Sequence, residues 1–177
     1  MDQVILVDTN DNELGFLEKL EAHQKGLLHR AFSVFLFNSH GELLLQKRAQ
    51  EKYHSDGLWT NTCCSHPRAG ESVLAAADRR LKEEMGIESE MREAFSFVYR
   101  SEMENGLIEH EYDHVLFGSF DGIPDPNPGE VSGWKYLSLD RIESELGAKP
   151  EAYTSWFRIC FMQVLEHFHK TYTKKVG

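Results

Sequence analysis

Short apolar runs separated by turn-forming residues predict the first strands of a sheet. Residues 4–7 are apolar, and the Asp-Thr-Asn-Asp-Asn segment at 8–12 follows them, as is typical of an edge strand or one arm of a hairpin. Residues 31–37 and 43–47 are rich in aliphatic and aromatic side chains, and Asn-Ser-His-Gly at 38–41 interrupts them. This pattern predicts a β-hairpin formed by these two runs.

The second half of the chain alternates between strand-like runs and turns. Residues 94–99 and 112–120 are predicted strands, and Asn105-Gly106 between them favours a hairpin turn. Three prolines make residues 123–129 a loop, because proline lacks the N–H that a central strand must donate. Residues 134–139 form the last predicted strand.

Helical patterns mark two further segments. Residues 72–85 carry three consecutive alanines and end before Gly86, which predicts a helix with a glycine stop. A short helix capped by Asp140 is expected to end at Gly147 and Pro150, whereas residues 16–28 fit either a short helix or an irregular arm. A long C-terminal helix is predicted by an apolar stripe at helical spacing, which consists of Tyr153, Trp156, Phe157, Cys160, Phe161, Val164, Leu165 and Phe168.

Together these elements indicate an α+β fold, in which helices flank a mixed β-sheet. The length of 177 residues is that of one domain, so we expect residues 1–177 to form a single unit. A net charge of −10 disfavours a nucleic-acid surface, although it leaves room for a local basic pocket that binds a small anion.

The same composition indicates a cytoplasmic protein that does not enter a membrane. No apolar run approaches the roughly 20 residues of a membrane span, and the Met-Asp-Gln start lacks the features of a signal peptide. Three cysteines, two of them adjacent, make a poor disulfide framework, which favours a reducing compartment.

Candidate chemistry is concentrated around the segment Thr-Asn-Thr-Cys-Cys-Ser-His-Pro at 60–67. Histidines lie upstream of it and a Glu-His-Glu cluster lies at 109–111. Imidazole and carboxylate groups are ligands that Zn²⁺ or Mn²⁺ accepts, and the thiol of Cys64 is two residues from His66. A thiol near a metal or a basic patch is expected to have a lowered pKa. The sequence therefore predicts a metal site with a proton-transfer group beside it, which points to an enzyme.

The helix at 72–85 carries a second pattern. Arg79 and Glu83 are four residues apart, as are Arg80 and Glu84, so both pairs are compatible with plain surface salt bridges. With Glu71, Leu81, Gly86 and Ile87, however, they occupy the spacing of the Nudix box, which resembles a diphosphate-binding helix whose carboxylates hold Mg²⁺.

Two positions depart from this box. Ser65 stands where the box opens with glycine, and Arg80 stands where an acid normally follows the arginine. Loss of that acid implies that water-driven hydrolysis is disabled, and a cation in its place is suited to grip a phosphate. The resemblance therefore implies a Nudix-like fold that binds a diphosphate without hydrolysing it.

Further motifs extend from Lys19 to Trp156 and make the resemblance more specific. They include Leu-Glu-Lys at 17–19, Gly-Leu-Trp-Thr-Asn at 57–61, Cys-Ser-His-Pro at 64–67 and Glu-His-Glu at 109–111. In combination they resemble type 1 isopentenyl-diphosphate isomerases, a Nudix-fold family that interconverts isopentenyl and dimethylallyl diphosphate for isoprenoid biosynthesis. The resemblance implies an N-terminal extension to the Nudix fold and a monomer that acts on an allylic or homoallylic diphosphate.

The resemblance also implies roles for individual residues. It implies that Mn²⁺ or Zn²⁺ is held by three histidines and two glutamates, namely His23, His29, His66, Glu109 and Glu111. It places Mg²⁺ between the substrate diphosphate and Glu84. The diphosphate contacts implied by the family are Lys19, Arg48, Lys52 and Arg80.

The implied catalytic residues act on a double bond. Protonation of the terminal alkene carbon gives a tertiary carbocation, and loss of a proton from the neighbouring carbon gives the internal alkene. The family assigns these steps to Cys64 and Glu111, whose roles exchange with the direction of reaction. Tyr99 would hydrogen-bond the acidic group, and the ring of Trp156 would face the cation. Cys63 and Cys160 are expected to be packing residues.

Two other functions remain open at this level. A Nudix hydrolase of another diphosphate is disfavoured by Arg80 and by the pairing of Cys64 with His66. A non-catalytic metal-binding protein would not need the thiol, Tyr99 and Trp156 around the same pocket.

Overall fold

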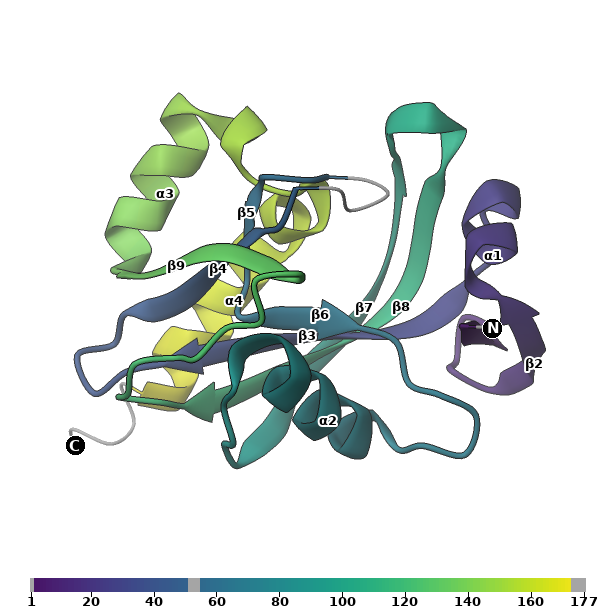
Figure 1. Ribbon diagram of the computed structural model, residues 1–177, viewed down its shortest axis with the longest axis horizontal. Coiled ribbons are helices and arrows are strands. Elements are labelled where there is room, and N and C mark those ends of the chain that lie inside the picture. The colour runs from purple at the N-terminus through teal and green to yellow at the C-terminus, as the bar shows by residue number, and fades with distance from the viewer. Residues whose placement is uncertain (1, 51–54, 173–177) are drawn as a thin grey trace.

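The structure is a computed structural model, and it describes residues 2–50 and 55–172 (Figure 1). Within them, nine strands form one mixed sheet: β1 (Gln3–Val7), β2 (Glu13–Glu18), β3 (His29–Phe37), β4 (Leu43–Arg48), β5 (Trp59–Thr60), β6 (Cys63–Ser65), β7 (Met91–Glu102), β8 (Ile108–Ser119) and β9 (Val131–Leu137). The helices are α1 (Lys19–Lys25), α2 (Val73–Met85), α3 (Leu139–Ala148) and α4 (Ser155–Tyr172), and short 3₁₀ turns occur at η1 (Glu104–Gly106) and η2 (Pro150–Ala152).

Strand β3 is the centre of the sheet. It runs parallel to β8 along its whole length, from the pair His29–Glu111 to the pair Phe37–Ser119. It is antiparallel to β6 on its other side, where Ser33 faces Cys64. Strands β7 and β8 form a long antiparallel hairpin, and β9 pairs with β4. The arrangement brings three segments that are distant in sequence onto adjacent strands.

Two helices cover the two faces of the sheet (Figure 1). Alternate residues of β3 point to opposite faces, as in any strand. Phe35 and Phe37 pack against α4, and Phe32 and Val34 pack against α2. Both clusters are dominated by fully buried side chains, so burial of apolar surface on both faces stabilises the sheet. The predicted α+β fold with flanking helices is confirmed.

The predicted glycine stop of α2 is confirmed, and Ser72, the first residue of the predicted helix, is its N-cap. The Ser72 side chain accepts a hydrogen bond from the backbone N–H of Ala75, and Gly86 ends the helix with a φ of 65°. A side chain at Gly86 would meet the Asp125 carbonyl oxygen at 2.6 Å, so glycine is required on steric as well as conformational grounds. The cap fixes the end of the helix that carries Glu84.

The apolar stripe of the C-terminal helix is confirmed, whereas the helix before it differs from the prediction. Ser138, rather than Asp140, caps α3, because its hydroxyl accepts the N–H of Arg141. The helix continues through Gly147 and ends at Ala148, so the predicted stop at Gly147 is wrong. Tyr153 precedes α4 and is buried beside Phe157.

The predicted hairpin of residues 31–37 and 43–47 is confirmed at its turn, where β3 and β4 are antiparallel, but not along the length of the two strands. Only Phe37 and Leu43 pair, and the strands then diverge because β6 and β8 occupy the two edges of β3. The hairpin of β7 and β8 is confirmed, and Asn105 and Gly106 adopt φ values of 63° and 73° at its tip. No helix of the described residues is long and apolar enough to cross a membrane.

The N-terminal segment forms an extension to the sheet. The predicted strand at residues 4–7 lies in β1. Strand β1 pairs with β2 along its length and with β3 through one pair, Leu6–His29, so it is the inner arm of a hairpin. Residues 16–28 contain the end of β2 and then α1, which is the short helix that the sequence left open. Arg30 binds the Asp11 carboxylate at 2.7 Å and anchors the tip of this hairpin to the sheet. The extension thereby brings α1 over the start of β8.

Candidate active site

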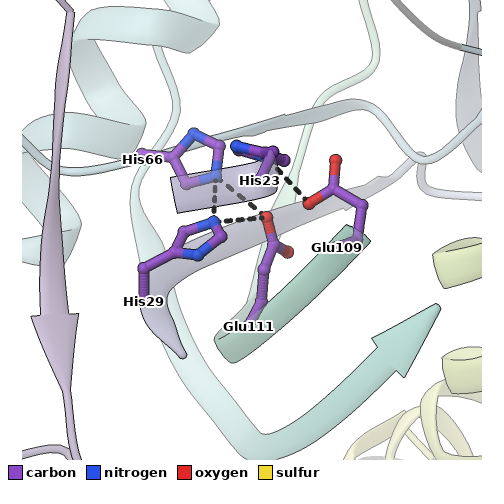
Figure 2. Close-up of side chains that lie close together, drawn as sticks. All are labelled: His23, His29, His66, Glu109 and Glu111. Atoms are coloured by element: carbon purple, nitrogen blue, oxygen red, sulfur yellow. Dashed lines mark hydrogen bonds and ion pairs between the residues drawn. The ribbon is translucent and has the colours of Figure 1, made fainter. Parts of the chain in front are cut away.

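Five predicted metal ligands converge from three parts of the chain (Figure 2). His23 comes from α1, His29 from the start of β3, His66 from the end of β6, and Glu109 and Glu111 from β8. One ligand atom from each of these side chains lies within 4.8 Å of every other. The register of β3 with β8 explains why two of the five side chains meet, because it places His29 directly beside Glu111.

Backbone carbonyls orient two of the histidines. The Nδ1 atoms of His23 and His29 lie 2.6 Å from the Lys19 carbonyl oxygen and 2.8 Å from the Leu27 carbonyl oxygen. A carbonyl oxygen only accepts, so both Nδ1 atoms carry a proton and donate it. The lone pair of each neutral imidazole is then on Nε2, which faces the cluster. Such a carbonyl contact is the usual way in which a metal-binding histidine is oriented.

The facing atoms fit a divalent cation. The Nε2 atoms of His29 and His66 are 3.2 Å apart, and Glu111 Oε1 is 2.9 Å from His66 Nε2. His23 Nε2 is 3.1 Å from Glu109 Oε2. The donor set of imidazoles and carboxylates suits borderline metals such as Zn²⁺ and Mn²⁺, and four of the five side chains are buried, whereas His66 is half-buried. The cluster is therefore compatible with binding of a divalent metal.

The protonation of the cluster supports the same conclusion. Burial lowers the pKa of His66 to about 4, so its ring is neutral near pH 7, which is the form that binds metals. Burial and the charge of Glu109 act to raise the pKa of Glu111, but hydrogen bonds with His29 and His66 outweigh them and hold it below its ordinary value. For His23, burial acts to lower the pKa, but the hydrogen bond to Glu109, the Lys19 carbonyl and the charges of Glu109 and Glu111 together outweigh it, so the pKa is raised.

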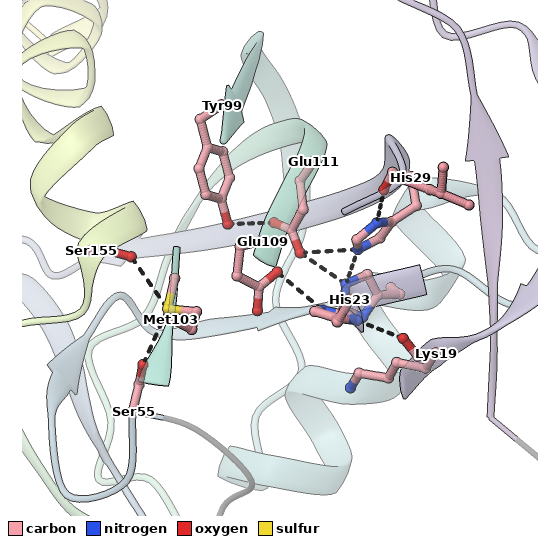
Figure 3. Close-up of polar contacts among 11 residues, drawn as sticks. Lys19, His23, His29, Ser55, Tyr99, Met103, Glu109, Glu111 and Ser155 are labelled. Atoms are coloured by element: carbon pink, nitrogen blue, oxygen red, sulfur yellow. Dashed lines mark hydrogen bonds and ion pairs between the residues drawn. The ribbon is translucent and has the colours of Figure 1, made fainter. Parts of the chain in front are cut away.

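Tyr99 is the predicted partner of Glu111, and the structure places it there (Figure 3). Its hydroxyl donates a 2.7 Å hydrogen bond to Glu111 Oε2, whereas Oε1 of the same carboxylate faces the histidines. Burial and the charge of Glu111 raise the pKa of Tyr99, so the phenol stays protonated. Glu111 thus has one oxygen toward the metal cluster and one oxygen toward a fixed donor.

Cys64 lies on the wall of a cavity of about 470 Å³, which Tyr99, Glu111 and Trp156 also line. The expected fall in the pKa of Cys64 is wrong in this structure. Burial raises the pKa of the thiol to about 12, and the positive charge of Arg48 offsets this only in part. The thiol is therefore protonated near neutral pH. Cys63 and Cys160 are buried in the two hydrophobic clusters, as predicted.

The cations predicted to bind a diphosphate lie around the same cavity. Lys19, Arg48 and Arg80 line it, and the guanidinium carbon of Arg48 is 5.3 Å from the ring centroid of Trp156. Lys52 lies outside the described residues. The cavity therefore joins a basic wall to an aromatic face.

Helix α2 contributes the carboxylate that was predicted to hold Mg²⁺. Glu84 lines the cavity and is 5% exposed, with Gln46 Nε2 donating to its Oε2 at 3.0 Å. Arg80 pairs with Glu84 and, at 2.7 Å, with Glu83. Its inner nitrogen, Nε, is buried without a hydrogen-bond partner among the described residues. An anion in the cavity would give the Arg80 guanidinium a further acceptor.

Arg79 has a different function from its neighbour. Its Nε and Nη2 atoms donate to the two oxygens of Glu71 at 2.7 and 2.8 Å, and its contact with Glu83 is longer, at 3.5 Å. The Glu71 carboxylate also accepts the backbone N–H of Arg68 at 2.9 Å. This pair ties α2 to the loop that follows His66, and it is more than a surface salt bridge.

The sequence did not indicate several polar residues at or beside the cavity. Ser33 and Glu130 line it, and Asp113 is buried two residues beyond Glu111 on β8. The alternation of β8 carried a signal for Asp113, because residues 109, 111 and 113 must point to one face of a strand. Ser33 and Glu130 had no comparable signal, since their place depends on which strands pair.

Comparison with known proteins agrees with this geometry. The NUDIX domain family matches residues 27–157. An isopentenyl-diphosphate Delta-isomerase 2 from Aromatoleum aromaticum is 54% identical over 93% of this chain and 87% of its own length. An isopentenyl-diphosphate Delta-isomerase from Pectobacterium atrosepticum is 52% identical over 94% of this chain and 93% of its own length.

Solved structures show the same fold at lower identity. The crystal structure of DR0079 from Deinococcus radiodurans has a TM-score of 0.77 and 21% identity, and it covers 92% of this chain and 98% of its own. A MutT protein from Methanosarcina mazei has a TM-score of 0.64 and 20% identity over 81% of this chain and 94% of its own. The family resemblance expected from the motifs is confirmed, and the chain belongs to the type 1 isopentenyl-diphosphate Delta-isomerases of the NUDIX family.

Proposed function

We propose that this protein interconverts isopentenyl and dimethylallyl diphosphate, with Cys64 and Glu111 as its acid and base. The observation that carries the proposal is the convergence of a thiol, a carboxylate and an aromatic ring on one cavity with a basic wall. An alkene placed between Cys64 and Glu111 has a proton-transfer group on each side. The diphosphate of the same molecule then faces the arginines.

The proton balance of this reaction is closed by two groups. One group gives a proton to the terminal alkene carbon, which leaves a tertiary carbocation. The other group removes a proton from the neighbouring carbon, and the internal double bond forms. Cys64 and Glu111 exchange the roles of acid and base when the reaction runs backward. Hydrogen bonding from Tyr99 holds Glu111 in one orientation during both steps.

Trp156 is the group that faces the cation. An aromatic ring attracts a cation through its quadrupole and has no lone pair that would attack it, and the interaction is worth about 0.5–2 kcal/mol. Trp156 is 4% exposed, so water has little access to that side of the cavity. Exclusion of water protects a carbocation from hydration, which would give an alcohol.

The diphosphate is bound in this proposal by Lys19, Arg48 and Arg80, and by Lys52 as the family motif implies. Arg80 supports the proposal because its side chain lines the cavity and its buried Nε has no hydrogen-bond partner among the described residues. Glu84, which already faces the cavity, would hold Mg²⁺ against the same diphosphate. Arg80 in place of an acid disfavours hydrolysis, because it removes a ligand from the helix that hydrolases use.

His23, His29, His66, Glu109 and Glu111 would hold Mn²⁺ or Zn²⁺. A bound cation would neutralise the two carboxylates and alter the proton affinity of Glu111. We also infer that residues 1–177 act as one domain and as a monomer in the cytoplasm. The continuous sheet supports the first inference, and the lack of a disulfide framework supports the last.

Proton NMR in deuterated buffer tests the function directly. Purified protein with Mg²⁺ and either Mn²⁺ or Zn²⁺ is expected to convert isopentenyl diphosphate to dimethylallyl diphosphate that carries deuterium. Cys64→Ala is expected to fold and to lose turnover, whereas Cys160→Ala, which alters a core thiol, is expected to retain it. Release of phosphate without isomerisation would instead identify a hydrolase. No reaction with metal bound would identify a non-catalytic protein.

A further inference from the structure

Two polar rows cross the face of the sheet that α4 covers. The first row contains His29, Glu111 and Tyr99, which are paired across β3, β8 and β7. The second row lies deeper along β3, beyond Ala31, where Ser33 is paired with Cys64 of β6. Directly opposite residues of antiparallel strands project to the same face, with Cβ atoms about 4.5–5.5 Å apart. Ser33 is therefore the side chain next to the Cys64 thiol.

The second row continues from Ser33 to Asp113. The Ser33 hydroxyl donates a 2.8 Å hydrogen bond to Asp113 Oδ2. Both residues are buried, with exposed fractions of 2% for Ser33 and 1% for Asp113. The second carboxyl oxygen, Oδ1, is buried and has no hydrogen-bond partner among the described residues. Asp113 is also close enough to Cys64 to interact with it electrostatically.

Ser33 and Asp113 form a polar pair next to an apolar part of the core. The next residues along the two strands on the same face, Phe35 and Val115, belong to the apolar core under α4. Two small apolar residues at 33 and 113 would extend that core without leaving a carboxyl oxygen unpaired. Buried polar groups that lack a partner are uncommon and destabilising, and they are often retained for function.

We propose that Ser33 and Asp113 are positioning residues for Cys64, as Tyr99 is for Glu111. A hydroxyl has one proton, and the Ser33 hydroxyl gives it to Asp113. The Ser33 oxygen then has only acceptor capacity toward Cys64, so it offers an acceptor to which the thiol proton can turn on the adjacent strand. Asp113 thus fixes the direction of Ser33, and in this proposal Ser33 selects the rotamer of Cys64 that points toward it. The inference rests on the proposed role of Cys64.

Substitution of Ser33 tests the pair with little risk to the fold. In the metal-loaded enzyme, Ser33→Ala is expected to lower kcat by about tenfold or more and to leave KM and metal content within about twofold. Ser33→Thr, which keeps the hydroxyl, is expected to restore most of kcat. Asp113→Asn keeps an acceptor for Ser33 and is expected to lose less activity than Asp113→Leu. The matched control is Ser96→Ala, which removes a serine hydroxyl that contacts Tyr112 across β7 and β8.

A second readout does not depend on turnover. Alkylation of Cys64 by iodoacetamide, located by peptide mass spectrometry, is expected to change in rate by about threefold or more in Ser33→Ala and to be unchanged in Ser96→Ala. Full kcat and an unaltered alkylation rate in Ser33→Ala would overturn the proposal. Equal losses in Ser33→Ala and Ser33→Thr would also overturn it, because they would indicate packing. Normal turnover of Cys64→Ala would instead refute the proposed function, since that variant leaves Ser33 and Asp113 intact.

Discussion

The guanidinium of Arg48 stacks over the indole ring of Trp156, with its carbon atom 5.3 Å from the ring centroid. Arg48 ends β4, and Trp156 lies in the first turn of α4, so the contact joins two elements that are distant in sequence. Both side chains line the cavity. The proposed diphosphate-binding wall and the proposed carbocation-facing ring are thus in direct contact.

Replacement of Trp156 is expected to act on the chemical step. Trp156→Leu should lower kcat by about 2–30-fold, because it removes a cation–π interaction of about 0.5–2 kcal/mol from the carbocation. Trp156→Phe keeps an aromatic face and should lose less. Trp134→Leu is the control, since Trp134 lies on β9 and packs on the α2 side of the sheet. A change in KM alone for Trp156→Leu would contradict the proposed role.

Metal removal is expected to lower stability as well as activity. Dialysis against a chelator should abolish turnover and lower Tm by several degrees, because a metal at 100 times its Kd contributes about 2.7 kcal/mol to the folded state. Mn²⁺ or Zn²⁺ should restore both quantities. His23→Asn should bind less metal, whereas His169→Asn, at an exposed position on α4, should bind as much as the wild type. An unaltered Tm after verified removal of the metal would argue against a site formed by the five ligands.

Much of the fold was predictable because its signals are local. The stop at Gly86 and the stripe of the last helix depend on neighbouring residues, and both are confirmed. The hairpin of residues 31–37 and 43–47 pairs only beside its turn, and the reason is non-local. Its turn is present, but β8 and β6 take the hydrogen-bonding edges of β3, and no local pattern encodes that choice.

In the site, too, local motifs were predictive and properties that depend on the folded structure were not. The sequence motifs named five predicted metal ligands, which the fold brings together, although they come from α1, β3, β8 and the residue after β6. The pKa of Cys64 could not be obtained in this way, because it depends on how deeply α4 buries the sulfur. Ser33 was missed because its significance comes from strand register, which places it beside Cys64.

Reversal of the charge at position 80 is expected to weaken substrate binding. Arg80→Glu would place a fourth carboxylate next to Glu83, Glu84 and Glu130, where Arg80 now pairs with all three. KM for isopentenyl diphosphate should therefore rise by about tenfold or more, because a cation on the cavity wall is replaced by an anion. Lys82→Glu makes the same charge change two residues away on the exposed side of α2. If both variants raised KM equally, the effect would be one of net charge and not of contact.

The ion pair of Glu71 with Arg79 is expected to make stability depend on pH in the acid range. The bidentate hydrogen bond from Arg79 holds the pKa of Glu71 at about 2, compared with 4.5 for the free side chain. Above pH 4.5 the carboxylate is ionised in both the folded and the unfolded chain, and the pair contributes in full, by about 1–3 kcal/mol. As the pH falls from 4.5 toward 2, the unfolded chain takes up the proton first and the contribution is lost.

Glu71→Gln should therefore unfold at a lower urea concentration than the wild type at pH 7, and this difference should shrink steadily as the pH is lowered toward 2. The variant Glu143→Gln removes a carboxylate from an exposed position on α3 and serves as the control, with no difference expected at either pH. If the difference in unfolding urea concentration between Glu71→Gln and wild type stayed constant from pH 7 to pH 2.5, the loss of stability would be due to packing. A difference that shrinks would show that Arg79 stabilises the loop after His66 through the charge of Glu71.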